Sequence, residues 1–172
     1  IAAVGAYLSQ YGIFIPTLAG AGMHVGVYKI PTLYNKVNVV YTNTVPVDAY
    51  RGAGRPEASY VIERLVDKAA DDLGIDPLEL RMKNFVQPDE IGKNEGSILP
   101  FDSCDFQKTT EMSIVNSSYS DFVNRKKSAD KSKYLKGIGV SYYVERTQGE
   151  GSENSRVVVS SDGSVKVYAG TM

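Results

Sequence analysis

The strongest constraint on the fold is a helical pattern that begins at Pro56 and is renewed once before Phe85. Apolar residues recur there at steps of three and four, which places them on one helix face. They are Val61, Ile62, Leu65, Val66, Ala69, Ala70 and Leu73. Pro56 suits a first helical turn, and Gly74 stands just past the last apolar position. Asp76 and Pro77 then restart a helix as cap and first residue, so the pattern predicts a helical hairpin.

The segments on both sides of this helical hairpin have the composition of β-strands. Valine and tyrosine alternate or run together in residues 24–31 and 36–44, as in buried or half-buried strands. Residues 137–145 have the same character. In residues 155–170, Asp162-Gly163 is a strong signal for a β-hairpin with a two-residue turn. The order of strands, central helices and C-terminal β-hairpin predicts the α+β class.

Composition excludes several classes of function. The 19 basic and 20 acidic residues nearly balance and form no long basic block, which argues against nucleic-acid binding. No apolar run approaches the roughly 18 residues that a membrane span needs. Cys104 is the single cysteine, so no internal disulfide can form, which fits a cytoplasmic protein. His24 has no partner of zinc-ligand type nearby in the sequence, so we expect no protein-ligated metal.

The stretch AYRGAGRPEA, residues 49–58, brings two glycines and two arginines to the start of the first helix. Glycine permits positive φ and close backbone approach, and a helix start offers N–H groups and a positive dipole end. The guanidinium groups of Arg51 and Arg55 are donors suited to phosphate. Two interpretations remain open: a seat for a phosphate-bearing ligand, or a tight strand-to-helix turn with surface arginines. Glu57 replaces the last glycine of a G-x-G-x-x-G motif, so the standard dinucleotide loop is not matched.

A longer stretch around this motif is similar to a known family. VDAYRGAGRPEASYVIERLVDKAADDLGIDPLELRMKNF, residues 47–85, resembles the signature region of the molybdopterin-binding large subunit of the xanthine dehydrogenase, aldehyde oxidase and aerobic carbon monoxide dehydrogenase family. YKIP, residues 28–31, and the closing GVSYY and SSDGSVKVYAGT resemble it too. The resemblance covers nearly the whole chain and is weakest over residues 87–135.

The resemblance implies a segment of a molybdenum hydroxylase that oxidises an aldehyde or an N-heteroaromatic compound. It implies molybdenum on molybdopterin, in the cytosine dinucleotide form, near Arg51, Gly52, Ala53 and Gly54. FAD and [2Fe–2S] clusters are expected on partners: a medium FAD-binding subunit and a small iron–sulfur subunit. The family's general-base glutamate lies in a part of the large subunit downstream of this chain. We therefore assign no catalytic residue here and expect the isolated chain to be inactive.

Three departures from the family pattern narrow the branch. Gly52 stands where the turn of carboxydotroph carbon monoxide dehydrogenases, A-Y-R-C-S-F-R, has a copper-binding cysteine. Ala53 stands where the xanthine-type turn, F-R-G-F-G, has a phenylalanine that stacks on the purine. No arginine lies near Ala19, the position upstream where xanthine-type enzymes carry one. The expected branch is therefore carbon monoxide dehydrogenase-like without the copper cysteine, and xanthine is a poor substrate.

Further candidates have both a functional and a structural interpretation. Tyr142 and Tyr143 fall where the family has an aromatic residue lining the substrate pocket, but tyrosine also favours ordinary strand packing. Arg55 suits either an anion or a salt bridge. Glu63, on the first helix, suits either solvent or a structural ion pair.

We expect three parts in the chain. Residues 1–86 form a cofactor-turn segment with a short N-terminal helix and the helical hairpin. Residues 87–135 form a variable linker with surface helices, and residues 136–172 form a β segment that opens the next subdomain. Because the chain begins at Ile1 and stops after a strand-like run, we expect a piece of a larger polypeptide.

Two alternatives to an enzyme segment stay open. One is a module that binds a phosphate-bearing ligand without redox chemistry. The other is an inactive remnant or split subunit with a structural role, docked on other subunits.

Overall fold

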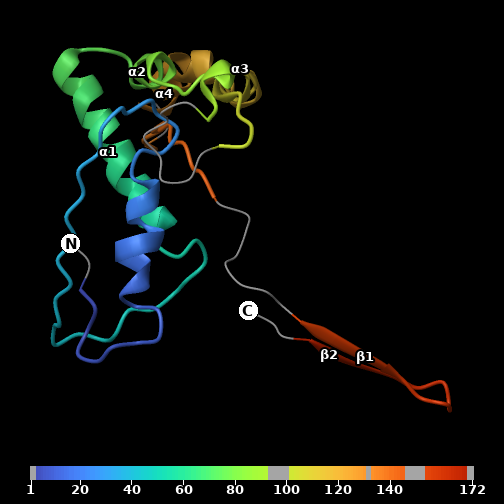
Figure 1. Cartoon of the computed structure of the whole chain (residues 1–172). Coiled ribbons are helices and arrows are strands. Elements are labelled where there is room, and N and C mark those ends of the chain that lie inside the picture. Colours follow the sequence, from blue (N-terminus) through green and yellow to red (C-terminus); the bar gives the residue numbers. More distant parts are fainter. Residues whose placement is uncertain (1–2, 93–100, 131–132, 146–153, 170–172) are drawn as a thin grey trace.

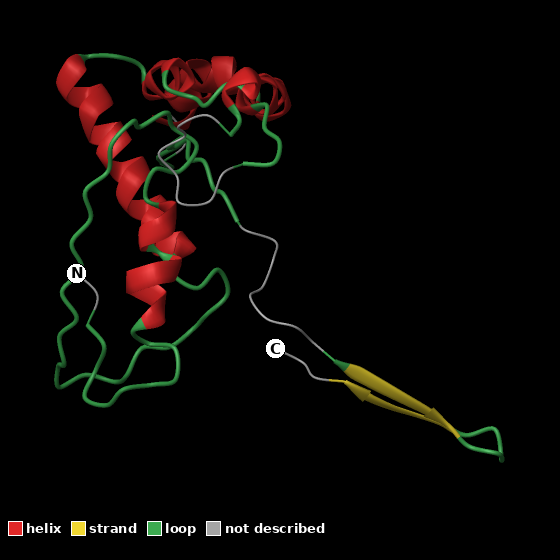
Figure 2. Ribbon diagram, viewed as in Figure 1, coloured by secondary structure: helices red, strands yellow, loops and turns green. Residues whose placement is uncertain are grey.

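The computed structural model describes residues 3–92, 101–130, 133–145 and 154–169. The four α-helices gather in one body, and a two-stranded hairpin projects away from it (Figures 1 and 2). The elements are η1 (Ile15–Ala19), η2 (Ala21–Met23), α1 (Arg55–Leu73), α2 (Pro77–Lys83), η3 (Pro88–Glu90), α3 (Phe106–Ser117), η4 (Tyr119–Asp121), α4 (Phe122–Asp130), β1 (Ser155–Val159) and β2 (Val165–Ala169). The described part of the chain is therefore mostly helical, with a C-terminal antiparallel β-hairpin.

The predicted helical hairpin is confirmed, and its caps are those that the sequence indicated. α1 ends at Gly74, which has φ 64° and donates its N–H to the carbonyls of Ala70 and Asp71. Asp76 caps α2, because its carboxylate accepts from the N–H groups of Leu78 at 2.9 Å and Glu79 at 3.1 Å. Glycine at the end of α1 and a capping aspartate before α2 turn the chain within two residues.

A single aromatic and aliphatic core joins all three expected parts of the chain. Val27, Tyr28 and Phe85 are buried at its centre. The Phe85 ring stacks on Tyr28 with centroids 6.3 Å apart and meets the edge of Tyr142 at 4.8 Å. The partly buried residues packed around this centre are Ile30, Ile62, Val66, Met82, Phe106, Tyr142 and Val144. Residues from 27 to 144 therefore share one core.

One fully buried guanidinium links α2 to α1 beside this core. Arg81 on α2 donates to the carboxylate of Glu63 at 2.9 Å and to Asp67 at 2.8 Å, both on α1. It also donates to the backbone carbonyls of Glu63 and Pro77, each at 3.1 Å. Although burial acts to lower it, these contacts with Asp67 and Glu63 raise the pKa of Arg81 above its usual range. The buried cation is therefore paired with two carboxylates.

Glu63 carries the network on to the N-terminal segment. The Tyr28 hydroxyl donates to its carboxylate at 2.6 Å. Burial, followed by this bond to an anion, raises the pKa of the Tyr28 phenol well above its usual range. Of the two interpretations of Glu63, the structural ion pair is the one observed.

The strands expected at residues 24–31 and 36–44 do not form. Tyr28 makes an isolated antiparallel bridge with Phe85. Three backbone hydrogen bonds, Val4 N to Val40 O, Thr42 N to Gly5 O and Ala6 N to Thr44 O, join residues 40–44 to residues 4–6. The β-rich composition does not produce a ladder here, because a strand also requires a partner along its length. The helix expected within residues 1–22 is reduced to the single turns η1 and η2.

The C-terminal prediction was partly wrong. Residues 137–145 form no strand, although Tyr142 and Val144 pack on the core. β1 and β2 do pair antiparallel, with Val157 opposite Val167 and Val159 opposite Val165. Their connection is a three-residue loop, 161–163, closed by the bond from Ser160 N to Ser164 O. Gly163 alone in it has positive φ, at 83°, whereas a two-residue type I′ turn needs two such residues.

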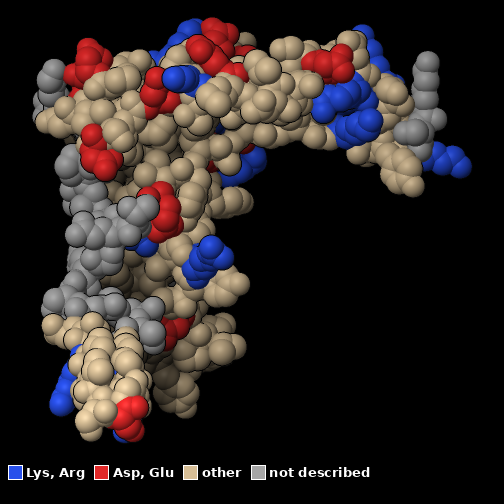
Figure 3. Space-filling model, turned by 90° about the vertical axis from the view of Figure 1, so that its right-hand side faces the viewer, with Lys and Arg blue, Asp and Glu red and all other residues tan. Residues whose placement is uncertain are grey.

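Acidic and basic side chains are interspersed on the face shown in Figure 3, in keeping with the balanced composition. None of the described helices is long and apolar enough to cross a membrane.

We predict that Arg81→Ala destabilises the fold by about 3–5 kcal/mol, because it leaves the buried Glu63 carboxylate without its cation. Urea unfolding monitored by circular dichroism measures the change. Lys83→Ala on the same helix is the control. Its ion pair with Glu79 is exposed and contributes less than about 1 kcal/mol. Equal losses for the two variants would contradict a special role for Arg81.

Candidate functional site

The glycine turn, residues 50–55, has an unusual backbone. Gly52, Ala53 and Gly54 follow one another with φ values of 93°, 42° and 89°. The turn is closed by hydrogen bonds from Ala53 N to Tyr50 O at 2.7 Å and from Arg55 N to Gly52 O at 3.0 Å. α1 begins at Arg55, the last residue of the turn, so the turn lies at the positive end of a 19-residue helix. Positive φ at Ala53 is strained and persists only when its surroundings enforce it.

The space beside each glycine is taken by the chain itself. A Cβ on Gly54 would overlap the Ile15 carbonyl oxygen and lie 2.8 Å from Gly20 N. A Cβ on Gly52 would lie 2.7 Å from the Pro56 ring and 2.9 Å from the Tyr143 hydroxyl. Both glycines are therefore required for the turn to pack against η1, η2 and the segment that holds Tyr143.

Gly20 is a residue of this site that sequence reasoning missed. A Cβ there would lie 3.1 Å from the Gly54 carbonyl oxygen, so the two glycines allow two backbones to meet. The only local signal is the small-residue run Ala19-Gly20-Ala21-Gly22, which does not reveal its partner.

The two arginines of the motif differ in their surroundings. Arg51 is exposed, and among the described residues its side chain has no recorded ion pair or hydrogen bond. Arg55 is largely buried: its Nη1 lies 3.1 Å from Glu145 Oε1 and 3.3 Å from the Gly52 carbonyl oxygen. Its Nε is buried with no hydrogen-bond partner in the described structure. Of the two interpretations of Arg55, the salt bridge is the one observed, whereas Arg51 is the exposed arginine of the motif.

Tyr143 lies beside the turn. Its hydroxyl donates to the carboxylate of Glu145, which also pairs with Arg55. This bond to an anion, helped by partial burial, raises the pKa of the Tyr143 phenol. The residue next to it has other contacts: the Tyr142 hydroxyl bonds to Thr110, and its ring packs on Phe85. Tyr142 therefore contacts the core, whereas its neighbour Tyr143 contacts the turn.

The remaining candidates have structural surroundings. His24 Nδ1 lies 3.0 Å from the Asn35 amide, and burial lowers the pKa of its imidazole. Cys104 Sγ lies 3.8 Å from the Val86 carbonyl oxygen. Within the described ranges, no three His, Cys, Asp or Glu side chains are grouped so as to hold a metal ion.

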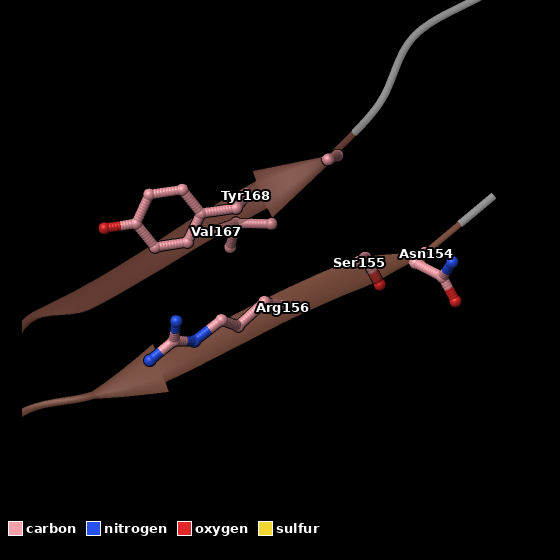
Figure 4. A pocket seen from close by; sticks show the side chains of 6 residues that line it. Asn154, Ser155, Arg156, Val167 and Tyr168 are labelled. Atoms are coloured by element: carbon pink, nitrogen blue, oxygen red, sulfur yellow. The ribbon is translucent and has the colours of Figure 1, made fainter.

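A surface hollow elsewhere does not belong to this site. It lies on the β1–β2 ribbon, lined by Asn154, Ser155, Arg156, Val167, Tyr168 and Ala169 (Figure 4). Figure 1 shows that this ribbon projects away from α1 and the turn that precedes it. It is a concavity of an exposed two-stranded ribbon, with no element packed over it in the described structure.

Comparison with known proteins places residues 1–85 in a cofactor-binding family. Residues 1–85, which include the turn and the helical hairpin, match the family described as Molybdopterin cofactor-binding domain. The 6-hydroxypseudooxynicotine dehydrogenase complex subunit gamma of Paenarthrobacter nicotinovorans is 27% identical over 96% of this chain and 21% of its own length. The aldehyde oxidoreductase of Megalodesulfovibrio gigas is 28% identical over 93% of this chain and 17% of its own length.

A solved structure agrees with these sequence relatives. Quinoline 2-oxidoreductase from Pseudomonas putida 86 superposes with a TM-score of 0.72 and 26% identity, over 96% of this chain and 23% of that one. The chain thus spans about a fifth of the length of the proteins it matches. It belongs to the molybdopterin-binding large-subunit family of the xanthine dehydrogenases, aldehyde oxidoreductases and carbon monoxide dehydrogenases, and its residues 1–85 match the molybdopterin cofactor-binding domain.

Proposed function

We propose that the glycine turn contributes to holding a molybdopterin cofactor, as one segment of the large subunit of a molybdenum hydroxylase. The observation that carries this proposal is the run of positive φ values at Gly52, Ala53 and Gly54, directly before the N-terminus of α1 and beside the exposed Arg51. Peptide N–H groups and the helix dipole at such a place favour oxygen-rich anions.

The residues present fit a phosphate-bearing pterin. Arg51 offers an uncommitted guanidinium, suited to phosphate or oxo groups. Pro56 has no N–H, the N–H groups of Ala53 and Arg55 are bonded within the turn, and the Arg55 side chain is paired with Glu145. The local donors for a ligand are therefore Arg51 and the backbone N–H groups that the turn does not use itself. When bound, the cofactor supplies molybdenum for oxidative hydroxylation; this chain's part is to bind and orient it. The dinucleotide form that we propose is the cytosine one.

We propose a carbon monoxide dehydrogenase-like branch that lacks the copper-binding cysteine, with an aldehyde or N-heteroaromatic substrate. Gly52 provides no thiolate, and Ala53 provides no ring to stack on a purine. The relatives include proteins named aldehyde oxidoreductase and nicotine 6-hydroxylase large subunit, in agreement with these two substrate classes. Of the two candidate pocket tyrosines, Tyr143 is the one whose hydroxyl faces the turn.

The remaining machinery is proposed to lie outside this chain. The base, the rest of the cofactor seat, FAD and [2Fe–2S] clusters would come from the remainder of the large subunit, a medium FAD-binding subunit and a small iron–sulfur subunit. Residues 1–86 would be the cofactor-turn segment, 87–135 a linker packed on it, and 136–172 the start of the next subdomain. The isolated chain would then be inactive.

One alternative is favoured by a specific observation. Val157, Val159, Val165 and Val167 lie on one face of the β1–β2 hairpin and are all more than half exposed. An apolar face of this kind favours a docking role, as in an inactive split subunit. A phosphate-binding module without redox chemistry would use the same turn and differ in lacking molybdenum.

We predict that the protein, tagged at its own locus and purified with its partners, contains molybdenum in about equimolar amount with the chain that holds this sequence. Iron and flavin are expected on companion chains. Elemental analysis by mass spectrometry, with the intact mass of every chain, measures this. Absence of molybdenum in a complex that retains iron and flavin would overturn the proposal and leave the docking or binding alternatives.

We predict that Arg51→Ala lowers molybdenum retention by about tenfold without loss of stability, since hydrogen bonds to charged groups contribute roughly 1.5–3 kcal/mol. The measurements are molybdenum per chain after gel filtration and the thermal unfolding midpoint. Arg64→Ala on the exposed side of α1 is the matched control and should retain molybdenum. Unchanged molybdenum content in Arg51→Ala would remove Arg51 from the cofactor seat.

We predict that Gly54→Ala destabilises the chain by about 3 kcal/mol or more, because the new Cβ overlaps the Ile15 carbonyl. Gly163→Ala is the matched control: its φ, 83°, is close to the 89° of Gly54, but no atom lies within 4 Å of its Cβ position. Its cost is the backbone strain alone, about 1–2 kcal/mol. Chemical unfolding separates the two, and similar costs would show that the turn yields to make room.

A further inference from the structure

The glycine turn is held by a segment distant in sequence. Nη1 of Arg55 lies 3.1 Å from Glu145 and 3.3 Å from the Gly52 carbonyl oxygen, so one nitrogen joins Glu145 to the turn. Tyr143 donates its hydroxyl to the same carboxylate and lies where a Gly52 side chain would be. Three side chains from α1 and residues 143–145 thus form one polar cluster against the turn.

The cluster is partly shielded from water. The side chain of Arg55 is 19% exposed and that of Glu145 is 36% exposed, so their attraction is screened less than that of a surface pair. Among the described residues, Arg55 Nε is buried without a hydrogen-bond partner, so the polar contacts that orient this guanidinium are those of Nη1 with Glu145 and the Gly52 carbonyl oxygen.

The turn needs external support of this kind. Ala53 has φ 42°, a conformation that a residue with a Cβ adopts only when neighbouring contacts enforce it. The bonds from Arg55 to Gly52 O and the contact of Tyr143 with Gly52 lie immediately before Ala53. On the other side, Gly54 packs against Ile15 and Gly20.

We propose that Glu145 is a positioning residue for the cofactor seat: through Arg55, and with Tyr143, it holds the glycine turn in the conformation that presents Arg51 and the backbone to the cofactor. This inference rests on the proposed function. It gives the two arginines of the motif different roles: Arg55 pairs with Glu145, and the exposed Arg51 faces the ligand.

The test compares Glu145→Ala and Glu145→Gln with the wild type in the purified complex. Hydrogen–deuterium exchange of peptides covering residues 49–58 measures turn opening, and molybdenum per chain measures cofactor retention. Glu145→Ala should speed exchange in the turn by about fivefold, the factor expected for loss of a partly buried ion pair, with a similar loss of molybdenum. Glu145→Gln, which can still accept from Tyr143, should give a smaller change in both.

Two further variants give specificity. Asp72→Ala breaks an exposed ion pair with Lys68 near the other end of α1, and should change neither measurement. In the Arg55→Ala background, Glu145→Ala should speed exchange in the turn less than it does in the wild type, because the contact through which Glu145 acts is already lost. An equal effect of Glu145→Ala in both backgrounds would overturn the role of the pair.

The outcomes separate the inference from the function on which it rests. Wild-type protein without molybdenum would overturn the proposed function, while the exchange data would still test whether Glu145 holds the turn. Wild-type protein with molybdenum, together with unchanged turn exchange in Glu145→Ala, would overturn the inference alone. Faster exchange throughout α1 and α2 would show a general loss of stability and would also overturn it.

Discussion

The rest of the structure depends on the ion pairs that the buried Arg81 guanidinium makes. It meets Glu63 and Asp67 on α1 from its place on α2, and Glu63 in turn accepts a hydrogen bond from Tyr28 in the N-terminal segment. A desolvated cation stabilises a fold only when every contact is in place, so this network sets the angle and register of α1 rather than merely adding attraction. The direction of α1 then determines where its N-terminus, and the turn before it, come to lie.

The conformation of the glycine turn depends on contacts with segments that are distant in sequence. Gly54 meets Gly20 across two backbones, and Gly52 lies under Tyr143. The positive φ values on which the proposed cofactor site rests therefore depend on segments before and after the turn in the chain. The conformation of this short motif is strained locally and is enforced by the fold around it.

The elements that could be predicted are those specified by neighbouring residues. The helical period, Gly74 and the Asp76 cap define the helical hairpin within thirty-odd residues of sequence. The strands expected at 36–44 and 137–145 were wrong, because strand formation depends on a partner ladder that composition does not reveal. For the same reason the Arg55–Glu145 pair, the Gly20–Gly54 contact and the opposite environments of Tyr142 and Tyr143 could not be predicted. Each depends on which segments meet, and only the resemblance to a family placed a cofactor at the turn.

The helical body and the β1–β2 hairpin differ in the contacts that stabilise them. The helical body has its own core around Phe85 and its own buried ion pair, so its geometry comes from contacts within residues 27–144. Within the described residues, the β1–β2 hairpin has only its own ladder, and an isolated two-stranded hairpin is marginally stable in water. Burial of its valine face against another apolar surface would add what the ladder lacks. The proposed cofactor turn lies on the self-supporting part, which is why substitutions at Arg51, Gly54 and Glu145 can be interpreted locally, whereas a change in the hairpin would also report on whatever covers it.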